Sequence, residues 1–212
     1  ERTHRLTMNK PTTLKVPLLD LKPQYEALKA DLDAALLKVA ASQHFILGPA
    51  VKELEAKVAE YSGAKHGIGL SSGTDALLIA LMAYDLGPGD EVVTTPYTFF
   101  ATGGTVARVG ARPVYFDIDP ETYNLRADLV RQFLETGCEK RAGGLYNRKS
   151  GGRVRAIIPV DLYGQPADMD AFMKLGREFG LAVIEDAAQA IGAEYAPGKR
   201  ACSSAGIGCL SF

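Results

Sequence analysis

Three residues of a short polar segment have the types and order that bind an anion. Ser72, Gly73 and Thr74 follow an apolar run and begin a helical one. The first amide N–H groups of a helix are unpaired and carry a partial positive charge, so they attract phosphate. Glycine lets the backbone approach the anion, and the two hydroxyl groups can add hydrogen bonds. The alternative is ordinary helix capping, which serine and threonine also favour.

A carboxylate and an amide follow a second apolar run. Asp186 comes at the carboxyl end of an expected strand over 181–185, where α/β folds place their ligands. An acid there can hold a proton on a cofactor ring, and beside a pyridinium nitrogen it would stay ionised. Gln189 could then reach a ring hydroxyl group. Equally, Asp186 could cap a helix over 187–191, with Gln189 completing a capping box. By strand alternation Glu185 points to the opposite face.

Two adjacent aromatic residues, Phe99 and Phe100, come shortly after the expected strand 91–94. An aromatic ring on this loop could stack on a flat cofactor ring and shield it from water. The alternative is that both rings belong to the hydrophobic core.

The elements that would position these residues alternate between short apolar runs and helical periodicity. The strands contain few polar residues, which indicates burial on both faces. We therefore predict an α/β fold, a three-layer αβα sandwich with a mainly parallel mixed sheet. Expected strands lie at 66–70, 91–94, 113–118, 156–160, 181–185 and 207–211, and expected helices at 73–85, 99–109, 128–134 and 169–179.

Two further helical segments precede this alternation. They begin at Pro23 and Pro49, and the second is expected to stop at Gly63. Later in the chain, the segment 136–155 is glycine-rich, basic and too long for an ordinary connection. It is either a solvated insertion or a cationic loop near an anionic substrate or a partner subunit.

The composition excludes several classes of protein. The chain has 212 residues, 47% of them hydrophobic and 23% charged, with a formal net charge of -1. This balance offers no basic surface, so we expect neither nucleic acid nor a membrane as partner. Three cysteines and three histidines without metal-ligand spacing argue against a metal site or a disulfide framework. With no apolar run of roughly 20 residues and no signal-peptide core around the candidate start Met8, we expect a cytoplasmic protein.

Five ordered motifs resemble one family when they are taken together. They are Ser-Gly-Thr-Asp-Ala-Leu (72–77), Gly-Pro-Gly-Asp-Glu-Val (87–92), Thr-Pro-Tyr-Thr-Phe-Phe-Ala-Thr (95–102), Asp-Leu-Tyr-Gly-Gln-Pro (161–166) and Glu-Asp-Ala-Ala-Gln-Ala-Ile-Gly-Ala (185–193). The chain thereby resembles the DegT/DnrJ/EryC1/StrS family of pyridoxal-phosphate-dependent sugar aminotransferases, which have the aspartate aminotransferase fold of type I. The resemblance implies a tail over 1–15, a helical lead-in over 16–62 and a cofactor-binding large domain over 63–212.

The resemblance also implies which residues bind pyridoxal 5'-phosphate. Gly73 and Thr74, with Ser72 nearby, and Ser211 would hold its phosphate. Phe99 would stack on the pyridine ring, the catalytic Asp186 would pair with the ring nitrogen, and Gln189 would contact the 3-oxygen. Asp161 stands where many members have histidine.

The activity implied is that of a transaminase in amino-sugar and polysaccharide biosynthesis. It would move an amino group from an amino acid, with glutamate as the expected donor, to a keto group of a nucleotide-linked sugar. A homodimer is expected. The family's dehydratase branch, in which histidine replaces the lysine, and a non-catalytic regulatory member remain alternatives. A nicotinamide-dependent oxidoreductase is disfavoured because no G-x-G-x-x-G follows a strand.

The family's Schiff-base lysine follows Ser-Phe within a few residues. In this chain Ser-Phe is Ser211-Phe212, at the end of the sequence, and Lys199 precedes the last expected strand. We therefore expect that the chain lacks this lysine and the small carboxyl-terminal domain.

Overall fold

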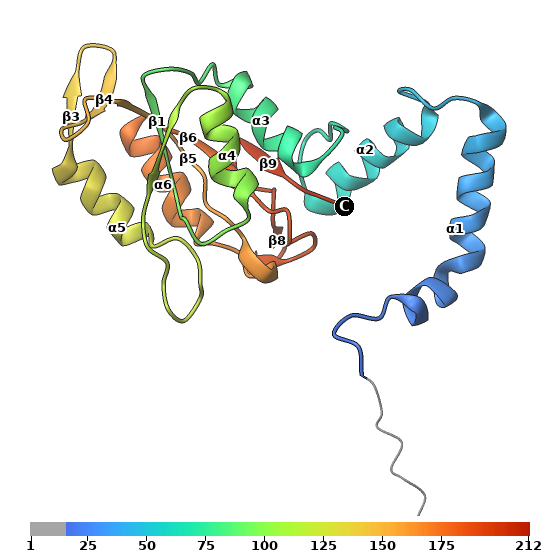
Figure 1. Ribbon diagram of the computed structural model, residues 1–212. Helices are drawn as coiled ribbons and strands as arrows, with labels where there is room; N and C mark the ends of the chain where they lie inside the picture. The colour runs from blue at the N-terminus through green and yellow to red at the C-terminus, as the bar shows by residue number, and fades with distance from the viewer. Residues whose placement is uncertain (1–15) are drawn as a thin grey trace, which may run out of the picture. The chain divides into compact units, whose positions relative to one another are not determined.

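The computed structural model describes residues 16–212 (Figure 1). The predicted tail over 1–15, with Met8, lies outside the described residues. The chain divides into two units, Glu1–Ala50 and Val51–Phe212, which are described separately.

The prolines and the glycine of the amino-terminal region mark the helix ends. α1 (Lys22–Ser42) has Pro23 in its first turn and ends at Gln43, whose φ of 58° is left-handed. α2 (Pro49–Ser62) begins at Pro49 and is followed by Gly63 with φ of 72°. Both predicted helices are confirmed. None of the helices within 16–212 has the length and apolar character that crossing a bilayer requires.

A mixed sheet runs through the second unit. Its strands are β1 (Asp90–Thr94), β2 (Arg112–Tyr115), β3 (Cys138–Arg141), β4 (Gly144–Asn147), β5 (Arg153–Ile157), β6 (Ala182–Asp186) and β9 (Ile207–Cys209). Parallel pairs join them in the order β2, β1, β5, β6, β9. β3 and β4 form an antiparallel hairpin beside the first half of β5. The mainly parallel mixed sheet is confirmed.

Helices cover both faces of this sheet. α3 (Gly73–Ala83) and α4 (Phe100–Arg108) pack on one face. α5 (Ala127–Gln132), a π-helical turn (Phe133–Gly137) and α6 (Met169–Phe179) pack on the other. The three-layer αβα sandwich is therefore confirmed. The shorter elements are a 3₁₀ turn (Leu162–Gly164), β7 (Glu194–Ala196) and β8 (Lys199–Arg200).

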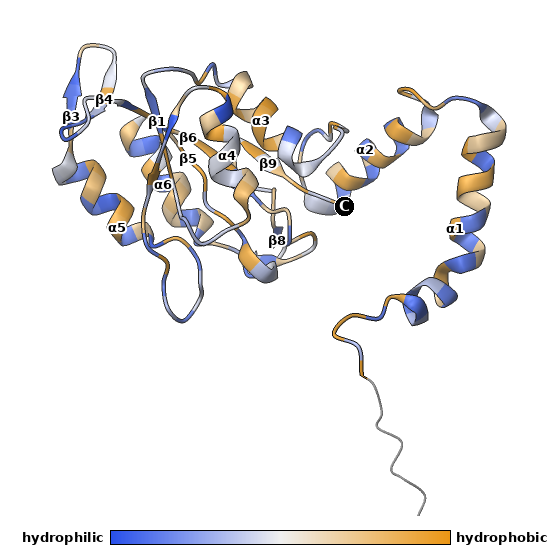
Figure 2. Cartoon of the chain, viewed as in Figure 1, coloured by the Kyte–Doolittle hydropathy of each residue, from blue (hydrophilic) through white to orange (hydrophobic). Residues whose placement is uncertain are grey.

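The central strands are apolar on both sides. In β1, Val92 points to the α3–α4 face and Val93 to the α5–α6 face. In β6, Val183 and Ile184 divide in the same way. Alternate residues of a strand point to opposite faces of the sheet, so a strand with helices packed on both faces has a continuous run of apolar residues. Figure 2 shows this hydrophobic colour along β6 and β9.

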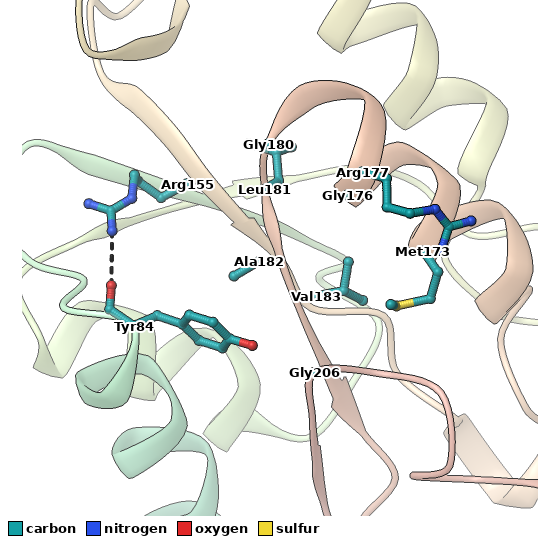
Figure 3. Close-up of a pocket in the computed structure, with 10 residues that line it drawn as sticks. All are labelled: Tyr84, Arg155, Met173, Gly176, Arg177, Gly180, Leu181, Ala182, Val183 and Gly206. Atoms are coloured by element: carbon teal, nitrogen blue, oxygen red, sulfur yellow. Dashed lines mark hydrogen bonds between the residues drawn. The ribbon is translucent and has the colours of Figure 1, made fainter.

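A cavity of about 510 Å³ lies at the amino-terminal ends of β6 and β9 (Figure 3). On one side of it, Arg155 Nη2 donates to the carbonyl oxygen of Tyr84 at 2.9 Å. On the other side, α6 approaches β6 closely at Gly176, where an added Cβ would lie 2.7 Å from Val183 Cγ2. None of the candidate site residues lines this cavity.

Replacing Gly176 with alanine is therefore expected to lower the free energy of unfolding by about 1–3 kcal/mol, because the new methyl group forces α6 away from β6. Urea unfolding measures this change. The matched control is Gly87→Ala, where the nearest atom to an added Cβ is the Val109 oxygen at 3.8 Å. Equal stability of the two variants would contradict the close packing of α6.

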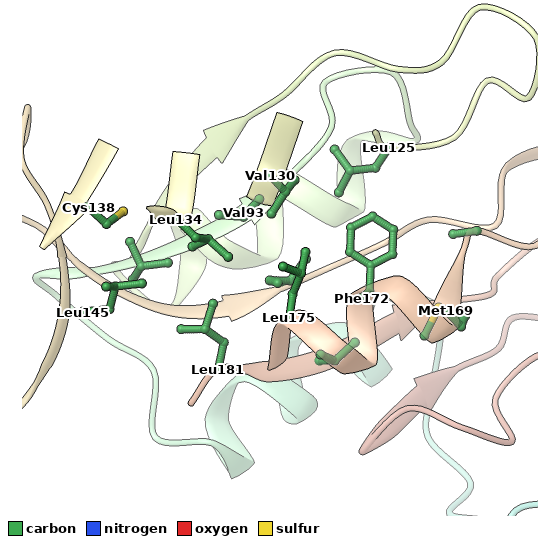
Figure 4. Packing of buried hydrophobic residues seen from close by; sticks show 14 residues of the cluster. Val93, Leu125, Val130, Leu134, Cys138, Leu145, Met169, Phe172, Leu175 and Leu181 are labelled. Carbon is green, nitrogen blue, oxygen red and sulfur yellow. The ribbon is translucent and has the colours of Figure 1, made fainter. Parts of the chain in front are cut away.

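The core of the α5–α6 face holds β6 in place (Figure 4). Phe172 and Leu175 of α6 are 0% and 1% exposed and lie in one cluster with Val130 and Leu134. Burial of such side chains contributes about 1.5–3 kcal/mol each. This packing fixes the strand whose last residue is Asp186.

The run 66–70 is not a strand. It pairs with no strand among the described residues, and Ile68 is 77% exposed. The run lies along α2 instead, where Gly69 N donates to Glu55 Oε1 at 2.8 Å. The prediction of a buried strand here is wrong, because a strand needs a hydrogen-bonded neighbour in addition to an apolar composition.

The insertion 136–155 is folded into the sheet as the β3–β4 hairpin. Asn147 Nδ2 donates to Glu91 Oε2 at 2.9 Å, and Ser150 Oγ donates to Glu91 Oε1 at 2.6 Å. Arg141 and Arg148 both form ion pairs with Glu139, at 2.5 and 2.9 Å. The hairpin borders the amino-terminal half of β5, so the structure does not support a cationic loop at the carboxyl ends of the strands.

Candidate active site

A pocket of about 260 Å³ lies at the carboxyl ends of the central strands. It is formed by the start of α3, the connection from β1 into α4, and the segments at the ends of β5, β6 and β9. The residues predicted to bind a cofactor all line it: Ser72, Gly73, Thr74, Phe99, Asp186, Gln189 and Ser211. The fold thus brings together side chains from distant parts of the sequence.

One corner of the pocket consists of the first residues of α3. Ser72 Oγ accepts a hydrogen bond from the Asp75 amide at 3.1 Å, so helix capping is confirmed for this serine. A Cβ added to Gly73 would lie 2.8 Å from Ser211 Cβ and 3.0 Å from Ser211 Oγ. Only glycine fits there. The Thr74 and Ser211 hydroxyl groups make no hydrogen bond within the described part of the chain, so both can donate to a ligand.

Asp186 is a buried carboxyl group, 5% exposed. Its Oδ2 accepts a hydrogen bond from Thr102 Oγ1 at 2.7 Å, and its Oδ1 accepts one from the Ala188 amide at 3.4 Å. Burial raises the pKa of Asp186, and these two hydrogen bonds oppose that rise. Among the described residues Asp186 has no cationic partner. The carboxyl group is therefore suited to a cation that a ligand would supply.

No helix follows Asp186. Residues 187–191 form turns, in which the Ala190 amide donates to the Ala187 carbonyl at 2.9 Å. The helix-capping interpretations of Asp186 and Gln189 are therefore wrong. The Gln189 side chain instead accepts a hydrogen bond from the Tyr163 amide through Oε1 at 2.9 Å, which leaves its amide N–H groups available to an oxygen in the pocket.

The two adjacent phenylalanines lie outside the core. Phe99 is 71% exposed and lines the pocket, whereas Phe100 is 84% exposed and does not. The core interpretation is wrong for both, because the buried face of α4 consists of residues that follow them, such as Thr102 and Val106. An exposed ring at a pocket suits the stacking of a flat ligand.

Two polar residues at the site had no assigned role in the sequence pattern. Thr102 donates to Asp186, and its hydroxyl group lies 2.9 Å from that of Thr98. The four-residue spacing of these two threonines in the sequence could have indicated that their side chains lie close together. Asp161 lines the pocket and is 1% exposed. No sequence signal indicated its burial, which depends on contacts with distant residues.

Comparison with known proteins identifies the family of this chain. A sequence profile of the DegT/DnrJ/EryC1/StrS aminotransferase family matches residues 26–212. A pleiotropic regulatory protein of Geobacillus stearothermophilus is 50% identical over 182 residues, which are 86% of this chain and 45% of that protein. UDP-2-acetamido-2-deoxy-3-oxo-D-glucuronate aminotransferase of Pseudomonas aeruginosa is 45% identical over 197 residues, 93% of this chain and 50% of that enzyme. The chain spans about half the length of the curated relatives it matches.

A solved structure shares the fold. DesV of S. venezuelae, crystallised in complex with a ketimine intermediate, superimposes with a TM-score of 0.79 at 39% identity, covering 93% of this chain and 48% of DesV. Since the family profile matches nearly the whole chain and the fold agrees, this chain belongs to the DegT/DnrJ/EryC1/StrS aminotransferase family.

Proposed function

We propose that this chain carries the cofactor-binding site of a pyridoxal 5'-phosphate-dependent sugar aminotransferase. One observation carries the proposal. A single pocket of about 260 Å³ is lined by anion donors at the start of α3, an exposed aromatic ring and a buried carboxyl group without a cation. A flat, phosphorylated, protonated heterocycle has the matching groups.

The residues present fit that cofactor. The absence of a side chain at Gly73 lets the start of α3 lie directly against Ser211, so the first amides of α3 and the hydroxyl groups of Thr74 and Ser211 line one corner of the pocket, where they would hold a phosphate. Phe99 would cover one face of the ring. The free amide N–H groups of Gln189 would donate to the 3-oxygen of the ring.

Asp186 would keep a proton on the ring nitrogen. When bound, the cofactor supplies a ring that withdraws electrons from the carbon that loses a proton, and protonation of the ring nitrogen strengthens this effect. Thr102 and the Ala188 amide hold the carboxyl group in place and favour its ionised form. A neighbouring pyridinium would lower the pKa of Asp186 further, because an opposite charge stabilises the carboxylate.

The proposed reaction moves an amino group from an amino acid, glutamate in our proposal, to a keto group of a nucleotide-linked sugar. The activity named for the P. aeruginosa relative supports transamination over the dehydratase branch. We also propose a cytoplasmic homodimer as the working form.

Calorimetric titration of the chain with pyridoxamine 5'-phosphate tests the pocket. We expect binding at least about tenfold tighter than that of pyridoxamine, because hydrogen bonds to a charged group contribute about 1.5–3 kcal/mol. Inorganic phosphate should compete. Equal affinity for the two amines would contradict the phosphate corner. In the full-length protein, amino transfer from glutamate to a keto-sugar nucleotide tests the reaction, and its absence would favour a regulatory role.

A further inference from the structure

Two buried carboxyl groups lie beside Asp186. Glu185, the preceding residue of β6, is 0% exposed, and Asp161 is 1% exposed. The Asp161 amide donates to the Asp186 carbonyl at 3.0 Å, so Asp161 is attached to the strand end that carries Asp186. Buried carboxyl groups are unfavourable unless their oxygens are hydrogen-bonded or their charge is removed.

Each of the two carboxyl groups has one satisfied oxygen and one unsatisfied oxygen. Asp161 Oδ1 accepts from the Ala167 amide at 2.8 Å, and Glu185 Oε1 accepts from the Cys202 amide at 3.0 Å. Asp161 Oδ2 and Glu185 Oε2 have no donor in the described structure. Val160, which precedes Asp161, pairs in parallel with Asp186, which follows Glu185, so Asp161 and Glu185 flank the same paired strand ends. Each group also affects the pKa of the other. A hydrogen bond between the two side chains would join the two unsatisfied oxygens. Two carboxylates cannot form that bond, because neither carries a proton, whereas one added proton satisfies both oxygens.

We propose that Asp161 and Glu185 share one proton, with Asp161 as donor and Glu185 as acceptor, and that this carboxyl pair fixes the strand end that positions Asp186. Burial, and then the charge of Glu185, raise the pKa of Asp161 to about 8. Burial also raises the pKa of Glu185, but hydrogen bonds from the Cys202 amide and Asp161 oppose that rise. The proton therefore belongs on Asp161.

Within the described residues, the groups around the pair are one further carboxyl group and two thiols, and none of them is a cation. The titratable groups that act on it are Asp186 and the thiols of Cys202 and Cys209. Burial raises the pKa of both thiols, that of Cys209 to about 12, so both are neutral at physiological pH. Without the shared proton, three carboxylates would lie together in a buried region. The proton removes one charge and leaves Asp186 free to be ionised. Asp161 and Glu185 are thus positioning residues.

Asp161→Asn tests the proposal, because the amide N–H of asparagine donates the same hydrogen bond but does not titrate. The pKa of Asp161 is about 8 in the folded chain and near 3.8 in the unfolded chain, so folding takes up a proton between these values. Stability then falls as pH rises through this range. Relative to the native sequence, the folded-to-unfolded ratio of Asp161→Asn should rise by up to about tenfold per pH unit from pH 5 towards pH 8. Urea unfolding at a series of pH values measures it.

Glu91→Gln is the matched control. Glu91 is also buried, at 1% exposed, but it accepts hydrogen bonds from Ser150, Arg112 and Asn147. Burial by itself would raise the pKa of Glu91, and these bonds hold it below its ordinary value. Glu91 is therefore an ionised carboxylate in the folded chain above pH 5. Glu91→Gln should be less stable than the native sequence by a constant factor from pH 5 to pH 8.

The proposal would be overturned if the folded-to-unfolded ratio of Asp161→Asn, relative to that of the native sequence, did not change with pH. A second measurement needs no variant. The infrared spectrum of the native chain at pH 6 should contain the carbonyl band of a protonated carboxylic acid, which disappears with a midpoint near pH 8. Absence of that band would also overturn it. Neither readout depends on bound cofactor, so the outcome is independent of the proposed aminotransferase activity.

Discussion

Replacing Asp186 with asparagine is expected to lower kcat for amino transfer by about a thousandfold, which corresponds to ~4 kcal/mol. Asparagine can accept a hydrogen bond from the ring nitrogen but carries no charge to keep that nitrogen protonated. The bond from Thr102 is to a side-chain oxygen, which asparagine retains in one orientation. Affinity for pyridoxamine 5'-phosphate should fall by no more than about tenfold, because the phosphate corner is unchanged. Steady-state kinetics and calorimetry of the full-length protein separate the two effects.

Asp170→Asn is the control for this substitution. Asp170 lies in the first turn of α6 with its side chain 71% exposed, and it pairs with Lys199 at 3.4 Å. Such exposed pairs contribute about 0–1 kcal/mol, so kcat should not change. If Asp186→Asn keeps its turnover, Asp186 does not face the ring nitrogen and the proposed assignment of the pocket fails.

Replacing Gly73 with valine is expected to weaken binding of pyridoxamine 5'-phosphate by about a hundredfold, or ~2.7 kcal/mol. The added Cβ would meet Ser211 Cβ at 2.8 Å, so the start of α3 and Ser211 would have to move apart, which would displace the donors assigned to the phosphate. The lost hydrogen bonds from α3 and Ser211 to a charged group account for an effect of this size.

Gly87→Ala serves again as a control, because an alanine there meets only ordinary contacts. Circular dichroism of both variants shows whether the fold is retained, and Gly73→Ala should give an intermediate affinity. Unchanged affinity in Gly73→Val, with the fold intact, would show that the phosphate binds elsewhere.

Hydrophobic patterning predicted those elements whose burial is decided locally. α6 has its predicted bounds, Met169–Phe179, because its apolar residues recur at helical spacing between the Asp168 cap and Gly180. The run 66–70 was wrongly predicted to be a strand, and the segment 136–155 was left with two interpretations. Whether an extended segment becomes a strand depends on a hydrogen-bonded neighbour that lies far away in the sequence, and composition does not encode that neighbour.

The candidate site was predictable to the extent that its residues belong to contiguous motifs. Asp186 stands at the end of an expected strand, and the α/β rule places such ends at the carboxyl edge of the sheet. Gly73 was predictable as a helix start, but the strand expected before it does not form. The Asp161–Glu185 pair was not predictable. Its members are in different motifs, and their proximity arises from the backbone contact between Asp161 and Asp186.

The β3–β4 hairpin has a consequence for the solubility of the chain. β4 covers the backbone donors and acceptors along the first half of β5, and the new margin of the sheet is β3, a strand of four residues. Three of these are Glu139, Lys140 and Arg141. A short margin of charged residues is a poor template for the strand of another molecule, since docking would bury charge. The insertion thus protects this border of the sheet from intermolecular β-pairing and aggregation.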